Sequence, residues 1–420
     1  MKLADSHSNL RKVAVTWLFA FTAAVYTVAV TATHGPAISS DAIHYMVAAR
    51  NLVEHGMLST YTGHPLVSYA PFLSWVYALL SLAGLSMETA ARLVNAVSYA
   101  AIILVVGKFA TSLPNPHNAV FTSAVLTSLL SVSLTGMSPV AMSEVLFVAL
   151  VLGAFWNAYC FVERGASRHY YWMCAASAAA ALTRYIGVTV IFACFLTIVT
   201  RMKLDFPKRL WLGCKYALIA LLPVCLWLTR NFILTGTFMG HREPSIFTIR
   251  EMVFDTAWAW SSWFVPFRFS KSTTLFALLL AVGLVTFIIH WHRHREEVDD
   301  AKSRFSFLII TYIVAYSFAL VVSAARIQFE GLSIRMWVPI SIPLILLIIF
   351  HGTHTRARKG SLCSFIHLLA VLAAASWIAA GFINAVKIGQ QGFRYGLGVF
   401  GGKDWRNSDT CRFLREAPLT

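Results

Sequence analysis

The stretch VAVTWLFAFTAAVYTVAVTAT, residues 13–33, contains no charged side chain and decides the fold class. A helix needs about 20 consecutive apolar residues to cross the hydrocarbon core of a bilayer, and this stretch is long enough. Three basic residues precede it, as in a signal peptide, but the run is long for a signal peptide and has no clear A-x-A cleavage site. We therefore predict a retained first transmembrane helix.

The composition of the whole chain agrees with this prediction. Of the 420 residues 58% are hydrophobic and only 12% are charged, about half the charge of a typical soluble domain. We predict an all-α, polytopic membrane protein with one transmembrane domain over residues 1–386 and a polar C-terminal tail over 387–420. The net charge of +16 suits loops that face anionic lipid headgroups, so nucleic acid is not an expected partner.

Apolar runs of similar length recur along the chain and predict further membrane-spanning helices. They cover residues 90–110, 119–135, 145–162, 171–199, 211–233, 273–291, 305–325, 337–350 and 363–386, with a weaker run at 68–85. The longest polar segments between them, 34–67 and 234–272, are predicted to form the active-site face.

Short basic segments predict the orientation, because loops rich in Lys and Arg tend to stay in the cytoplasm. Placing 1–12, 163–170, 201–210, 292–304 and 351–360 inside requires 171–199 to cross an even number of times. One helix of that length would be about 43 Å long, so we predict two short helices that turn near Thr183 and Arg184. With Asp41 and Glu144 both outside, residues 68–85 form a partly inserted or interfacial helix. The result is about eleven crossings with an inside N-terminus and an outside C-terminus, although six basic residues in the tail would also suit an inside C-terminus.

Ionisable residues near the membrane boundary are functional candidates, because burying a charge in a bilayer is costly. Asp41 precedes an amphipathic run and suits either an N-cap or a chemical role. Glu144 begins an apolar helix, where a carboxylate also complements the helix dipole. Arg184 lies inside an apolar stretch, whereas Arg230 and Arg335 lie near helix ends. A single arginine at a helix end commonly snorkels to the interface, but several in related positions favour a shared function.

Eight short motifs occur in one order between Asp41 and Pro343. They are D-x-x-x-Y (41–45), A-R-x-L-x-x-x-G (49–56), H-P-L (64–66), A-R-L-V-N (91–95), S-E-x-L-F (143–147), L-T-R-Y (182–185), R-N-x-x-x-T-G (230–236) and R-M-x-x-P-x-x-x-P (335–343). The series resembles the GT-C membrane glycosyltransferases, in particular the branch with the protein O-mannosyltransferases and the lipid A aminoarabinose transferases. The first loop has no second acid beside Asp41 and the H-P-L motif has no second proline, so the subfamily stays open.

The resemblance implies an enzyme that moves a sugar from a polyprenyl-phosphate donor to a hydroxyl acceptor at the outer face of the membrane. The acceptor is a lipid, a glycan or a protein. Such chemistry needs a carboxylate to accept the acceptor's proton, and Asp41 is the candidate. It also needs positive charge where the phosphate leaves. Glu144 can orient the acceptor, assist Asp41 or pair with an arginine. The substrate-binding candidates are Tyr45, Arg184, Arg230, Asn231 and Arg335.

Other interpretations stay open. A divalent metal held by a carboxylate and the loop histidines (His34, His44, His55 and His64) is conceivable, although their spacings match no metal motif. The tryptophans of the second outer segment (Trp258, Trp260 and Trp263) suit either sugar stacking or an interfacial aromatic belt. Intramembrane charges also suit a transporter or lipid-linked-sugar flippase, and a GT-C-like subunit without activity is a third class. The compact loops and the lack of organelle sorting signals favour a bacterial inner membrane.

Overall fold

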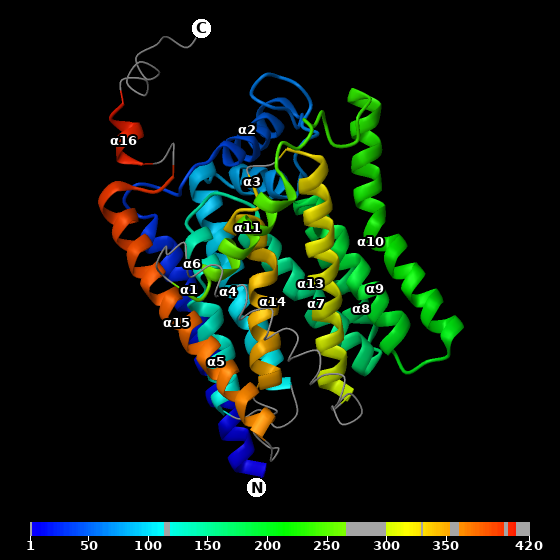
Figure 1. Cartoon of the computed structure of the whole chain (residues 1–420). Helices are drawn as coiled ribbons and strands as arrows, with labels where there is room; N and C mark the ends of the chain where they lie inside the picture. Colours follow the sequence, from blue (N-terminus) through cyan, green and yellow to red (C-terminus); the bar gives the residue numbers. More distant parts are fainter. Residues whose placement is uncertain are drawn as a thin grey trace.

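The structure is a computed structural model that describes residues 2–112, 118–265, 300–328, 331–352, 361–398 and 402–408. The all-α prediction is confirmed: this part of the chain contains helices and three isolated bridges, but no strand (Figure 1). The helices are α1 (Lys2–Val30), α2 (Ser40–His55), α3 (Phe72–Leu82), α4 (Met87–Ser112), α5 (Asn118–Leu129), α6 (Val132–Met137), α7 (Glu144–Arg164), α8 (Ser167–Thr183), the 3-10 turn η1 (Tyr185–Gly187), α9 (Val188–Arg201), α10 (Phe206–Thr235), α11 (Ile249–Ser261), α13 (Asp300–Arg326), α14 (Ile334–Gly352), α15 (Ser361–Tyr395) and α16 (Lys403–Arg406).

Seven helices in the described ranges are long and apolar enough to cross a membrane, and three shorter ones are apolar. The chain is therefore a multi-pass integral membrane protein. The long candidates are Asn9–Val30, Met87–Ser112, Asn118–Met137, Glu144–Arg164, Phe206–Thr235, Ser303–Arg326 and His367–Tyr395. The figure of about eleven crossings stays a prediction, and the predicted span 273–291 lies outside the described residues.

The apolar stretch 171–199 forms two helices, as predicted. Helix α8 ends at Thr183, Arg184 has extended backbone (φ −147°, ψ 128°), and α9 begins at Val188 after the short turn η1. The turns α7–α8 and α9–α10 lie at the same end of the molecule as the N-terminus (Figure 1). These turns contain two of the basic segments that are predicted to lie inside. Their position beside the N-terminus agrees with a basic face on that side of the membrane.

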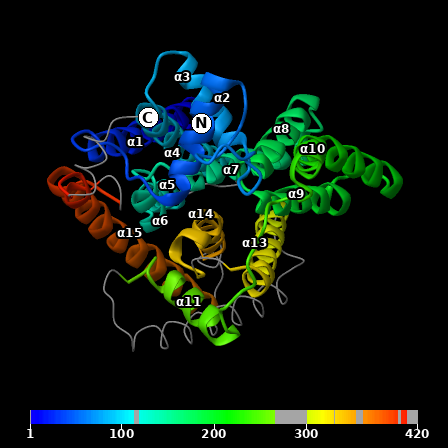
Figure 2. The ribbon, with the colours of Figure 1, turned by 90° about the horizontal axis from the view of Figure 1, so that it is seen from above.

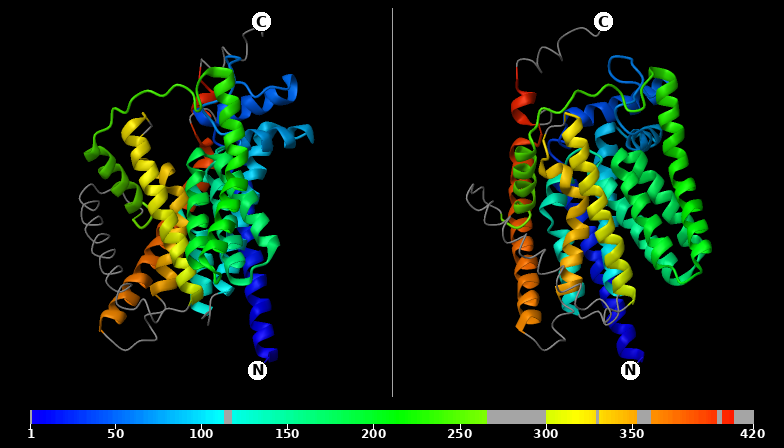
Figure 3. Two further views of the ribbon diagram at one scale, coloured as in Figure 1. Left: turned by 90° about the vertical axis from the view of Figure 1, so that its right-hand side faces the viewer. Right: turned by 45° about the vertical axis from the view of Figure 1, so that its right-hand side comes forward.

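The other end of the molecule carries two short helices that lie across the bundle. Figure 3 shows α2 and α3 at a steep angle to the long helices. They pack against each other through buried side chains that include Tyr45, Ala49, Leu73 and Tyr77. The weak apolar run at 68–85 therefore contains an 11-residue helix, which is too short to span a bilayer.

Helix α14 lies near the centre of the bundle, where it packs against α5, α7, α11, α13 and α15 (Figure 2). Prolines 339 and 343 lie within it, and Arg335 lies in its first turn. Other helices surround α14 on several sides. The guanidinium of Arg335 is therefore directed at other residues of the chain and not at lipid. Helix α14 therefore brings a cation to the end of the bundle that carries α2.

The second outer segment contains a helix, α11, that packs onto this core. The Trp263 side chain is fully buried, and its ring lies 5.7 Å from that of Trp260 and 5.8 Å from that of Trp377. The Trp260 ring lies 5.5 Å from that of Trp337 on α14. Both expected roles are therefore wrong for Trp263, which is a core residue. Farther along, α15 continues to Tyr395, so the first part of the segment 387–420 is helical.

Candidate active site

A backbone bridge places the start of α2 beside the start of α7. The amide of Ala37 donates to the carbonyl of Pro139 at 2.8 Å, and the amide of Ala141 donates to the carbonyl of Ala37 at 2.9 Å. Both bonds lie a few residues before the helix starts. The bridge therefore brings Asp41, in the first turn of α2, close to Glu144, the first residue of α7.

Asn95 of the A-R-L-V-N motif supports this bridge from α4. Its buried side-chain amide donates to the carbonyls of Ser138 at 3.0 Å and Val140 at 2.5 Å. Arg92 of the same motif donates to the carbonyl of Thr31 at 2.8 Å. The motif thus holds the two segments that lead into the site, a role that its sequence alone does not reveal.

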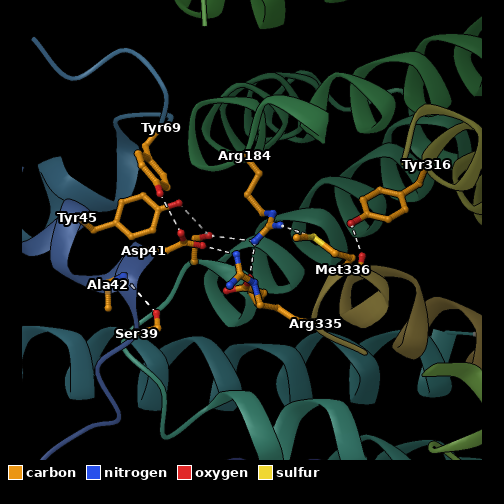
Figure 4. A network of polar contacts seen from close by, with 11 residues as sticks. Ser39, Asp41, Ala42, Tyr45, Tyr69, Arg184, Tyr316, Arg335 and Met336 are labelled. Atoms are coloured by element: carbon orange, nitrogen blue, oxygen red, sulfur yellow. Dashed lines mark hydrogen bonds and ion pairs between the residues drawn. The ribbon is translucent and has the colours of Figure 1, made fainter. Parts of the chain in front are cut away.

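The N-cap of α2 is Ser39, so the capping interpretation of Asp41 is wrong. The Ser39 hydroxyl accepts a hydrogen bond from the amide of Ala42 at 3.3 Å, which satisfies one of the open amides at the helix start. The Asp41 carboxylate is then directed away from its own helix and toward side chains from other elements (Figure 4).

Arg335 forms ion pairs with both Asp41 and Glu144. Arg335 Nη2 donates to Asp41 Oδ2. The Nε atom of the same guanidinium lies 3.0 Å from Glu144 Oε1. One arginine on α14 therefore bridges two carboxylates that come from α2 and α7.

A second arginine completes the cluster. Arg184 Nη1 donates to Glu144 Oε1 at 2.6 Å and to the Ser143 hydroxyl at 3.3 Å, and Nη2 donates to the sulfur of Met336 at 3.7 Å. The Tyr45 hydroxyl lies 3.5 Å from that of Ser143. The structure thus brings together five predicted residues: Asp41, Tyr45, Glu144, Arg184 and Arg335.

These charged side chains differ in their exposure. The side chain of Glu144 is 1% exposed, whereas those of Asp41, Arg184 and Arg335 are 17%, 16% and 19% exposed. A fully buried carboxylate needs cationic partners because its desolvation is costly. Glu144 therefore acts as the buried anchor for the two arginines, while the three other side chains keep a face that a substrate can reach. Two acids and two arginines leave the cluster with no net formal charge.

The position of Arg184 depends on the break between α8 and α9. Its backbone amide still donates to the carbonyl of Ala180 at 3.0 Å, and the amide of Gly187 donates back to the carbonyl of Arg184 at 2.7 Å. A Cβ on Gly187 would lie 2.6 Å from backbone atoms of Ala180 and Ala181. Glycine at this position thus allows the tight turn that directs Arg184 at Glu144.

Tyr69 is a site residue that the sequence analysis missed. Its hydroxyl donates to Asp41 Oδ1 at 2.9 Å, so both oxygens of Asp41 have partners. Burial, and then the charge of Asp41, raises the pKa of Tyr69, and burial raises the pKa of Tyr45 to about 12. Both phenols therefore keep their protons at neutral pH and remain available as hydrogen-bond donors.

His44 lies beside this pair of aromatic rings. Its ring stacks on that of Tyr69 with centroids 4.8 Å apart, and the Tyr61 ring lies at 5.6 Å. Burial lowers the pKa of His44, although the charge of Asp41 opposes the effect. Among the described residues, no three His, Cys, Asp or Glu side chains gather closely enough to hold a metal ion.

Arg230 and Asn231 lie outside the network of Asp41 and Glu144. Arg230 Nη1 donates to the carbonyl of Leu66 at 2.9 Å and to Asn231 Oδ1 at 3.0 Å. The guanidinium lies over the Trp227 ring, 4.5 Å from its centroid. The contacts of Arg230 in the structure are thus with the loop before α3 and with its own helix.

An apolar groove of about 550 Å³ lies between α9 and α13. Its wall includes Val188, Phe192, Leu196, Ile310, Val314 and Phe318. Several of these side chains are exposed, including Phe318 at 70%. The groove reaches Val188 in the first turn of α9, four positions after Arg184 in the chain.

Residues 63–227 match the family of dolichyl-phosphate-mannose-protein mannosyltransferases. The crystal structure of the Archaeoglobus fulgidus oligosaccharyltransferase in the apo form is 12% identical to this chain and has a TM-score of 0.52, over 96% of this chain and 58% of that one. The chain has the GT-C fold. The GT-C chain spans a little over half the length of the archaeal enzyme.

The structure of ArnT from Cupriavidus metallidurans bound to undecaprenyl phosphate is also similar, with 16% identity and a TM-score of 0.43, over 91% of this chain and 78% of that one. No curated protein sequence resembles the chain closely enough to count as a relative. The likeness of fold rests on the archaeal enzyme, whereas the chemistry of the chain has to be argued from the site.

Proposed function

We propose that this chain is a membrane glycosyltransferase that moves a sugar from a polyprenyl-phosphate donor to a hydroxyl acceptor. The observation that carries the proposal is the meeting of Asp41 with Arg184 and Arg335 around Glu144. The family matched over residues 63–227 is named for a dolichyl-phosphate-mannose donor, which is a polyprenyl-type phosphate. This supports the donor class.

In the proposed reaction, the acceptor oxygen forms a bond to the anomeric carbon while the bond from that carbon to the phosphate oxygen breaks. Asp41 accepts the proton of the acceptor hydroxyl, as a general base must be within hydrogen-bond reach of that proton. The bonding electron pair leaves with the phosphate. Tyr69 holds one oxygen of Asp41 at 2.9 Å, which orients the carboxylate for this step.

Arg184 and Arg335 are proposed to bind the phosphate as it leaves. Negative charge builds on the leaving oxygen in the transition state, so fixed donors at this position lower the barrier. Guanidinium groups suit this role because they donate two parallel hydrogen bonds to phosphate oxygens. Both side chains are partly exposed while Glu144 holds them from the buried side. The role proposed for Glu144 is therefore to orient the two arginines.

The groove between α9 and α13 supports a lipid-linked donor. Its apolar wall matches the chemistry of a prenyl chain. Such a chain is stabilised when it leaves water or packs in place of membrane lipid. The groove approaches Arg184 through the first turn of α9. A prenyl phosphate seated there would have its tail in the groove and its phosphate near the arginines.

The outer face of a bacterial inner membrane is the proposed location of the site. The basic turns lie at the end of the molecule opposite α2 and α3 (Figure 1), and basic loops stay in the cytoplasm. This arrangement supports a periplasmic position for Asp41. The acceptor is a hydroxyl on a lipid, glycan or protein that can reach that face.

The test is donor consumption by the purified protein in proteoliposomes. Undecaprenyl-phosphate mannose and a panel of other undecaprenyl-phosphate sugars are supplied together with an extract of periplasmic acceptors, and released undecaprenyl phosphate is measured. We expect Asp41→Asn to lower the rate by roughly 100- to 10,000-fold. Asp205→Asn, at an exposed carboxylate before α10, is the matched control and should retain the rate.

Two outcomes would contradict the proposal. Asp41→Asn with the turnover of the wild type would refute the base assignment. Movement of the intact lipid-linked sugar across the bilayer, without any release of undecaprenyl phosphate, would instead support the transporter or flippase class.

A further inference from the structure

Four consecutive backbone carbonyls before α3 are held by side chains from the region of η1, α10 and the segment after it. Arg230 donates to the carbonyl of Leu66 at 2.9 Å, and Arg242 donates to that of Ser68 at 2.7 Å. The Tyr185 hydroxyl lies 3.0 Å from the carbonyl of Val67 and 3.3 Å from that of Tyr69. We call residues 66–69 the clamped segment.

The side chains that hold the clamped segment are themselves fixed. Trp227 Nε1 donates to the Tyr185 hydroxyl at 2.9 Å, and the Arg230 guanidinium lies over the Trp227 ring. Asn231 is fully buried, accepts from Arg230 and donates to the carbonyl of Phe238 at 3.0 Å. The R-N pair of α10 is thus one hydrogen-bonded unit directed at the clamped segment.

The clamped segment ends in Tyr69, whose hydroxyl donates to Asp41 Oδ1. Any movement of the segment would carry the Tyr69 side chain with it and change this hydrogen bond. This hydrogen bond fixes the position of one oxygen of the carboxylate. The clamp therefore has a direct physical route to the orientation of Asp41.

We propose that Arg230 and Arg242 are positioning residues that act on Asp41 through the clamped segment and Tyr69. This rests on the proposed function, in which Asp41 is the base. The alternative for Arg230 is direct binding of the donor phosphate, as its motif predicts. The two roles differ in what they change: positioning of Asp41 alters kcat, whereas phosphate binding alters the affinity for the donor.

The first experiment measures the clamp without any need for activity. Hydrogen–deuterium exchange of peptides that cover residues 57–70 is compared in the full-length wild type and in single variants in detergent micelles. We expect roughly 2- to 10-fold faster exchange in Arg230→Gln and in Arg242→Gln, because each loses a hydrogen bond to the segment. Arg250→Gln, at an exposed arginine in the first turn of α11, is the control. Unchanged exchange in both clamp variants would overturn the proposal, whether or not the protein transfers a sugar.

The second experiment separates positioning from phosphate binding by a double-mutant cycle with Tyr69→Phe. The values of kcat and of the donor KM are measured separately with the donor found in the consumption assay. We expect Tyr69→Phe to lower kcat with the donor KM nearly unchanged, because Asp41 loses a hydrogen bond that orients it, and Arg230→Gln to have the same effect. The double variant should show little further change.

Two results would overturn the proposal in this cycle. One is a 10-fold or larger rise in the donor KM of Arg230→Gln with kcat unchanged, which would make Arg230 a phosphate ligand. The other is full additivity of the two substitutions, which would show that they act on Asp41 independently. If Arg230→Gln does not fold, Arg242→Gln provides the same cycle, because Arg242 is exposed and contacts the carbonyl of Ser68 in the same segment.

Discussion

Arg335 and Asp41 form an ion pair between α14 and α2 although 294 positions separate them in the chain. The pair joins the central helix of the bundle to a helix that lies across its end. It also ties the proposed base to the buried Glu144, because the same guanidinium contacts both acids. The proposed base, the two arginines and the buried Glu144 are therefore one electrostatic unit, and a change in one member should affect the others.

Arg184→Ala should impair use of the donor more than it impairs folding. The substitution removes a guanidinium that is proposed to face the leaving phosphate, and we expect kcat/KM for the donor to fall by roughly 100- to 1,000-fold. The measurement is undecaprenyl phosphate release at several donor concentrations. Arg168→Ala, at an exposed arginine near the start of α8, should retain donor use. An Arg184→Ala protein that loses its fold instead would show that this arginine is mainly structural.

Glu144→Gln should destabilise the protein. The carboxylate is 1% exposed and contacts Arg184 and Arg335, and removing one partner of a buried ionic contact costs about 3–5 kcal/mol. We expect a clearly lower thermal unfolding midpoint in detergent. Glu54→Gln, on an exposed side chain at the end of α2, provides the comparison and should leave the midpoint unchanged. Equal midpoints for Glu144→Gln and the wild type would contradict the anchor role.

His44 should make the stability of the protein fall as the pH falls below about 6.5, the unfolded value for histidine. Because burial lowers its pKa in the folded state, the unfolded chain binds a proton at a pH where the folded chain does not. Its contribution to stability is present above pH 6.5 and is lost progressively down to the lowered folded value. Thermal unfolding at pH 7.5 and 5.5 should therefore show a larger drop for the wild type than for His44→Gln. The same substitution at exposed His55 is the control, and equal drops for the wild type and His44→Gln would contradict the prediction.

The orientation can be measured with single cysteines. In a background without the seven native cysteines, a cysteine at exposed Thr62, in the loop after α2, should react with a membrane-impermeant thiol reagent in intact cells. A cysteine at exposed Ser167, the first residue of α8, should react only after the cells are opened. The reverse pattern would place the site on the cytoplasmic side.

The sequence alone predicts much of the cluster because its members belong to recognisable local patterns. Asp41, Glu144, Arg184 and Arg335 are charges at positions where an apolar run begins, ends or is interrupted, and burying a charge there is costly without a function. The division of 171–199 into two helices follows in the same way from helix length and the position of basic loops.

Other features could not be predicted because they depend on backbone partners. Tyr69 lies in the run predicted as an interfacial helix but falls in the loop before α3, and nothing local indicates that its hydroxyl reaches Asp41. Arg230 looks like a phosphate ligand by residue type, but its partner is a carbonyl of Leu66, and a carbonyl is present at every residue. Asn95 is similar, since it binds the carbonyls of Ser138 and Val140.

The close approach of Gly187 to Ala180 and Ala181 has a consequence for anyone who randomises this chain. A saturation library at position 187 should return almost only glycine among active clones, because even alanine would push the turn away from α8 and move Arg184. Position 187 would then tolerate substitution as poorly as a residue that contacts the sugar. A mutational scan that ranks positions only by loss of activity would therefore mistake a tight backbone turn for a contact with substrate.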